Sequence, residues 1–133
     1  MIDYTYNDSE GAPAMVDAGT YYVKALGYET GLTNKGDQKM TLKLQIKDGP
    51  IVYDILTFTP KAMWKMDVVL KAFSVSKKKP LPAKGSKINV DEEFMKTYIV
   101  DGYCQAEVVI DEYKGRKRNK VSNFIVPPIN CLL

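Results

Sequence analysis

The clearest pattern in the chain is a strict alternation of apolar and polar side chains in QKMTLKLQIK, residues 38 to 47. Met40, Leu42, Leu44 and Ile46 fall on one face, and polar residues, mostly lysines, fall on the other. A period of two residues is that of a strand with one buried face. We therefore predict a β-strand here, in a sheet whose outer side carries lysine.

Four further segments have the composition of strands. They are rich in β-branched and aromatic residues and are bounded by glycine, asparagine, aspartate or proline, which favour turns. These segments span residues 20–30, 51–59, 102–113 and 119–126. In the segment 102–113, the alternation predicts that Cys104, Ala106, Val108 and Ile110 face the core. Gly27 is a candidate for a bulge in the first strand.

Helical spacing replaces the alternation between the third and fourth predicted strands. Pro60 stands where helices often begin, and apolar residues recur every three to four positions from Lys61 to Phe73, which predicts a helix. Residues 76 to 87 hold two prolines, a glycine and five lysines, so we expect an exposed loop. Asp91 is expected to cap a short helix that ends near Tyr98.

The predicted order is three strands in a meander, a helix, a loop and a two-strand hairpin. This succession is typical of the five-stranded OB-fold barrel, a mainly β fold with its helix between the third and fourth strands. An α+β open antiparallel sheet with the helix on one face is the alternative. We expect one domain over residues 19–127, preceded by a lead segment, residues 1–18, and followed by a short tail, residues 128–133.

Composition argues against enzymes and membrane proteins. The chain has 133 residues, no histidine and two distant cysteines, Cys104 and Cys131, so His-based triads and closed zinc sites lack ligands. Neighbouring carboxylates at 91–93 and 111–112 are interpreted as helix caps and solvated charges. There is no phosphate-binding glycine motif, no secretion signal and no apolar run of about 20 residues. We expect a cytoplasmic, non-enzymatic protein without a cofactor.

The positive charge is concentrated in two places. The net charge is only +3, but residues 77–87 and 114–120 are dense in lysine and arginine. The second cluster is the predicted turn of the last hairpin, EYKGRKRNKV. Its two arginines, Arg116 and Arg118, offer bidentate contacts to phosphate and planes that stack on bases. A solvated hairpin tip is the alternative interpretation.

Tyrosines are interleaved with these cations on the predicted outward faces of the strands. Cations that follow phosphates and flat side chains that stack on bases are the two needs of a single-strand site. Tyrosine rings that merely pack under lysine stems are the alternative. The candidate DNA-binding residues are Tyr22, Lys24, Tyr28, Lys35, Lys39, Lys43, Tyr103, Tyr113, Lys114, Arg116, Lys117, Arg118 and Lys120.

The stretches TNKGDQKMTLKLQI, DGPIVYDILTF, AMWKM and DEYKGRKRNKVSNFIVP resemble a family of small bacteriophage single-stranded DNA-binding proteins with an OB fold. In this resemblance, Gly115, Arg116, Arg118 and Asn119 match a G-R-x-x-N turn whose basic residues are expected on phosphates. It implies a role in phage DNA replication or recombination, in the cytoplasm of the infected host cell.

The expected partner is single-stranded DNA, with phage or host replication and recombination proteins as further candidates and self-association into a homo-oligomer left open. The final residues, VPPINCLL, lack the acidic tail of many single-stranded DNA-binding proteins, so recruitment through such a tail is not expected. A protein-binding OB module that docks on an acidic partner surface through the same basic hairpin is the alternative function.

Overall fold

The computed structural model describes residue 3 and residues 15–126. Within these residues, five strands and two helices follow one another: β1 (Gly19–Leu32), β2 (Gln38–Ile46), β3 (Ile51–Thr57), α1 (Met63–Lys77), α2 (Glu92–Tyr98), β4 (Tyr103–Tyr113) and β5 (Arg116–Ile125). The predicted order of elements, with a helix between the third and fourth strands, is confirmed.

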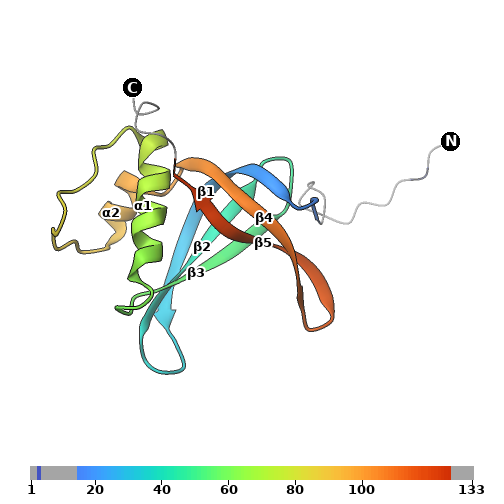
Figure 1. Cartoon of the computed structure of the whole chain (residues 1–133), viewed down its shortest axis with the longest axis horizontal. Coiled ribbons are helices and arrows are strands. Elements are labelled where there is room, and N and C mark those ends of the chain that lie inside the picture. The colour runs from blue at the N-terminus through green and yellow to red at the C-terminus, as the bar shows by residue number, and fades with distance from the viewer. Residues whose placement is uncertain (1–2, 4–14, 127–133) are drawn as a thin grey trace.

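The strands form one antiparallel sheet in the order β3-β2-β1-β4-β5. The sheet is strongly curved, and both helices lie together on one side of the molecule (Figure 1). β3 and β5, the two edge strands, approach each other but are not hydrogen-bonded neighbours. The fold is thus mainly β and barrel-like, and the barrel is open along the seam between β3 and β5.

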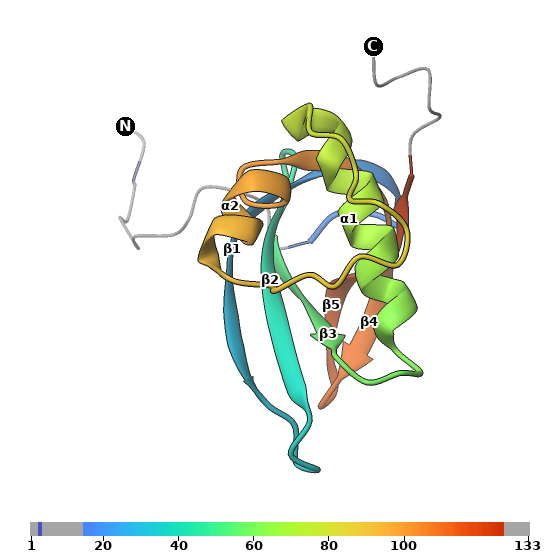
Figure 2. The ribbon, with the colours of Figure 1, turned by 90° about the vertical axis from the view of Figure 1, so that its left-hand side faces the viewer.

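The core confirms the alternation in β2. Met40, Leu42, Leu44 and Ile46 are all buried. Figure 2 shows α1 crossing one side of the curved sheet, where Phe73 is fully buried. The ring of Phe73 packs against that of Phe124 on β5, with centroids 5.7 Å apart. The helix therefore stabilises the sheet close to the strand that carries the basic hairpin.

A bulge in β1 changes which face its side chains occupy. The register with β2 shifts between Ala25 and Gly27, as the glycine suggested. After the shift, Tyr28 lies opposite the buried Leu42 and packs against the core. The predicted outward position of Tyr28 is therefore wrong, because one extra residue reverses the alternation beyond it.

Two other local predictions are wrong in detail. α1 begins at Met63 and continues to Lys77, beyond the predicted end at Phe73. Its last turn is held by tertiary hydrogen bonds: the ammonium of Lys77 donates to the carbonyl oxygen of Val100 at 2.8 Å. Ile110 is exposed, because the β4–β5 hairpin extends past the core at that point.

The Asp91 cap is confirmed, since its carboxylate accepts the backbone N–H of Phe94 at 2.9 Å.

The β4–β5 hairpin closes with a two-residue turn at Lys114 and Gly115. Their φ angles are 52° and 77°. Both lie in the left-handed region, which a two-residue hairpin turn with positive φ at both positions requires. Tyr113 and Arg116 are backbone register partners on either side of the turn, and the Tyr113 side chain, a predicted DNA-binding residue, lies outside the described part of the structure. The cationic residues that follow the turn belong to the extended strand β5, so their side chains point alternately to its two sides.

Candidate nucleic-acid interface

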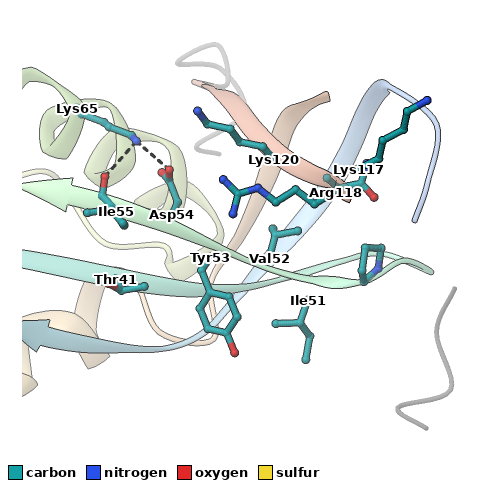
Figure 3. Close-up of a pocket in the computed structure, with 12 residues that line it drawn as sticks. Thr41, Ile51, Val52, Tyr53, Asp54, Ile55, Lys65, Lys117, Arg118 and Lys120 are labelled. Carbon is teal, nitrogen blue, oxygen red and sulfur yellow. Dashed lines mark hydrogen bonds and ion pairs between the residues drawn. The ribbon is translucent and has the colours of Figure 1, made fainter. Parts of the chain in front are cut away.

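A groove of about 490 Å³ follows the open seam. One wall comes from β3 and the other from β5, with Lys65 of α1 at the margin (Figure 3). The lining residues are Thr41, Pro50, Ile51, Val52, Tyr53, Asp54, Ile55, Lys65, Lys117, Arg118, Asn119 and Lys120. The groove thus exists because the two sheet edges face each other without pairing.

The β5 wall is cationic. Lys117, Arg118 and Lys120 line it, and all three side chains are exposed. Figure 3 shows the guanidinium of Arg118 extending from β5 toward β3. Arg118 also lies 3.7 Å from the carboxylate of Asp111, in an ion pair that is exposed to water and therefore weak. Lys114 and Arg116, at the tip, are not among the residues that line the groove.

The β3 wall carries exposed apolar surface. Val52, Asp54 and Leu56 are buried, so the intervening Tyr53 and Ile55 point outward, and Tyr53 is 61% exposed. In Figure 3 the Tyr53 ring lies on the opposite side of the β3 ribbon from Arg118. The groove and the outer face of β3 therefore meet at Tyr53. Sequence reasoning left Tyr53 and its strand face unassigned.

An ion pair neutralises Asp54, the one acid among the described residues that line the groove. Asp54 is only 5% exposed, and its Oδ1 accepts from the Lys65 ammonium at 2.8 Å. The same ammonium lies 3.3 Å from the carbonyl oxygen of Ile55 on the β3 edge. The second carboxylate oxygen, Oδ2, has no hydrogen-bond partner among the described residues. The net positive charge of the groove therefore comes from β5.

Three predicted residues gather elsewhere, on the outer face of β1 and β4. Tyr22 and Tyr103 are 49% and 55% exposed, and their rings meet edge to face with centroids 6.2 Å apart. Lys24 lies directly opposite Tyr103 in the β1–β4 register. None of the three lines the groove. These three residues therefore lie apart from the β3–β5 groove, because β1 and β4 lie in the middle of the sheet, and their role in DNA binding stays a prediction.

The predicted lysines of the β1–β2 hairpin lie on a different strand pair from the basic cluster. Lys35 is in the exposed turn, and Lys39 and Lys43 are on β2. Lys43 is opposite Tyr53 in the β2–β3 register. Figures 1 and 2 show the β1–β2 and β4–β5 tips projecting toward the same end of the molecule. On the outer face of the sheet, Lys43 lies between Tyr53 on β3 and the residues of β1.

The thiol of Cys104 is buried on the core face of β4, and this burial raises its pKa from 9.0 to about 12. We expect it to resist thiol reagents at pH 8 until the protein unfolds, since only the thiolate reacts. A thiol pKa raised by folding contributes stability below pH 9, which is lost as the pH rises toward 12. Reaction rates of a Cys131→Ser variant with and without urea test this; fast labelling in the native state contradicts it.

No metal centre is evident in the part of the chain that the structure describes. Within residue 3 and residues 15–126, no three histidine, cysteine, aspartate or glutamate side chains gather as metal ligands would. In the same residues, no helix combines the length and apolar character needed to cross a membrane. No protein-family model matches the chain, and no curated protein matches it.

Proposed function

We propose that this protein binds single-stranded DNA along the β3–β5 groove with little sequence preference. The observation that carries the proposal is that Arg118 and its lysine neighbours on β5 line a groove whose other wall, β3, presents the exposed Tyr53 ring on its outer side. The resemblance to phage single-stranded DNA-binding proteins supports this function and extends the proposal to phage DNA replication or recombination in the host cytoplasm.

The two walls suit the two parts of a nucleotide. Phosphates are attracted to Lys117, Arg118 and Lys120, and the guanidinium also offers paired donors to phosphate oxygens. The Tyr53 ring, on the outer side of β3, offers a flat surface for an unstacked base. Contacts to phosphate carry no sequence information, and stacking accepts every base. Low sequence preference follows from both.

Single strands are favoured over duplexes because of Tyr53. A base stacks on a protein ring only when it has left its own helical stack, which costs little in a single strand. In a duplex, the β5 cations are still attracted to the backbone, but the ring has no free base to contact. The proposal therefore predicts tighter binding of a single strand than of a duplex of equal length.

The decisive experiment is a fluorescence anisotropy titration of single- and double-stranded oligonucleotides of equal length. Tyr53→Ala is expected to lower the single-strand affinity by about 1–3 kcal/mol, because it removes one stacked base. Trp64→Ala is the matched control, since Trp64 is 63% exposed on α1 and does not line the groove.

Three outcomes contradict the proposal in different ways. If wild-type protein binds neither oligonucleotide at low salt, DNA binding is wrong. Equal affinity for duplex and single strand removes the stacking role of Tyr53. Binding of polyglutamate as tight as that of DNA, and unaffected by Tyr53→Ala, favours docking on an acidic protein surface instead.

A further inference from the structure

We infer that Tyr22, Lys24 and Tyr103 form a second contact surface for the same nucleic-acid strand, on the outer face of β1 and β4. This inference rests on the proposed function and adds a path that the strand takes after it leaves the groove. It makes the binding site longer than the groove alone and assigns two further base-stacking residues.

The tyrosine pair has the form that base stacking needs. Tyr22 and Tyr103 come from neighbouring strands and are each about half exposed. Their planes are inclined at 65°, so the rings touch edge to face and do not cover each other as stacked rings do. Each ring therefore keeps flat surface for a base, and the contact limits how far either ring moves.

The surroundings of the pair are polar and include one lysine. Lys24 lies opposite Tyr103, and Gln45 lies opposite Lys24 on the next strand. Gln105 lies opposite Tyr22. Glu107 lies close to the pair on this face, since it is two residues from Gln105 along β4 and opposite Thr20. Glu29, opposite Thr41, is farther from the pair.

A continuous route joins this surface to the groove. Tyr53 on β3 is opposite Lys43 on β2, and Lys43 is two residues from Gln45 on the same face. Gln45 is opposite Lys24, which is opposite Tyr103. The route crosses three strand spacings, or about 14 Å. Along it a strand meets an aromatic ring, two lysines and then the tyrosine pair, which is the alternation of stacking and charge that single-strand sites use.

This arrangement fits a polyanion better than an apolar protein partner. A protein interface needs a contiguous apolar centre, with charged residues depleted there. Here Lys24 stands beside Tyr103 in the middle of the surface, and Gln45 and Gln105 flank the pair. Lys43 connects this surface to the cationic groove, which favours as its occupant the DNA strand proposed to bind in that groove.

A length series of oligonucleotides tests the inference. Single OB-type sites cover roughly 4–16 nucleotides, so oligomers of about 4 and about 16 nucleotides bracket the groove alone and the full route. A Tyr22→Ala/Tyr103→Ala variant is expected to bind the short oligomer like wild type and the long one more weakly, by roughly 30-fold or more, since two stacked bases are lost. Tyr53→Ala weakens both lengths, and Trp64→Ala weakens neither.

The outcomes separate this inference from the proposed function. If the double variant binds the long oligomer as tightly as wild type, the second surface is wrong while the groove stands. Equal losses at both lengths also overturn it, since the tyrosines then act on the groove or the fold, which thermal unfolding of the variant reports. A change in self-association without a loss of DNA affinity assigns the surface to a protein contact. If wild type binds neither length, both proposals fail.

Discussion

Replacing Arg118 and Lys120 together by glutamate is expected to lower the affinity for single-stranded DNA by roughly 100-fold or more at low salt. The change removes two cations from the β5 wall of the groove and places two like charges beside the phosphates. The slope of log affinity against log salt should become shallower by about 1.4, since each lost phosphate contact accounts for about 0.7 with single strands. Anisotropy titrations at several salt concentrations measure both quantities.

The matched control is Lys114→Glu/Arg116→Glu. It makes the same change in charge at the hairpin tip, outside the residues that line the groove. We expect a smaller loss of affinity, which salt screens more easily because the reversed charges lie farther from the strand. If both variants lose affinity equally, net charge alone governs binding and the groove is not its location. Melting temperatures show whether loss of the exposed Arg118–Asp111 pair affects folding.

Replacing Lys65 by methionine is expected to destabilise the protein by about 3 kcal/mol, the lower end of the range for breaking a buried ion pair. Asp54 is almost fully buried and would keep a charge with no partner. Lys65 itself is partly exposed, so water reaches the site and moderates the cost. Asp54→Asn is expected to cost less, because it removes the buried charge and leaves Lys65 able to reach water. Urea denaturation measures both.

A double variant sharpens this test. Asp54→Leu/Lys65→Met removes both charges, and we expect it to recover much of the stability lost in Lys65→Met. Greater damage from Asp54→Asn than from Lys65→Met contradicts the explanation. DNA affinity provides a second check: it should fall in Lys65→Met, which leaves the Asp54 charge unpaired in the groove, and change little in Asp54→Leu/Lys65→Met, which keeps the net charge of the native pair.

The fold followed from sequence wherever local chemistry decided the structure. The alternation in β2 acts through neighbouring residues and is confirmed. The predicted turn of the last hairpin is confirmed at Lys114 and Gly115, but β5 begins at Arg116, earlier than the predicted start at residue 119. The bulge at Gly27 was visible, but its effect on Tyr28 was not. A bulge shifts every later side chain to the other face, and no local signal states how many residues it adds.

The candidate site was only partly predictable. Basic residues on β5 were identified by their density, yet which of them line a groove depends on where β3 ends up in space. Tyr53 was missed because Asp54, a charged residue, occupies a buried position and hides the alternation of β3. Its partner Lys65 lies eleven residues away on a helix. Only their contact explains why a carboxylate is tolerated there, and this contact is tertiary.

The open seam also bears on how copies of this protein avoid one another. Each edge strand presents unpaired backbone groups, which invite pairing with the edge of a second sheet. Here both edges face each other across one groove, and β5 carries Lys117, Arg118 and Lys120 along that edge. Like charges on two approaching copies repel, and lysine on an edge strand is a common protection against aggregation. The residues proposed to attract DNA are therefore also expected to oppose edge-to-edge association of the DNA-free protein.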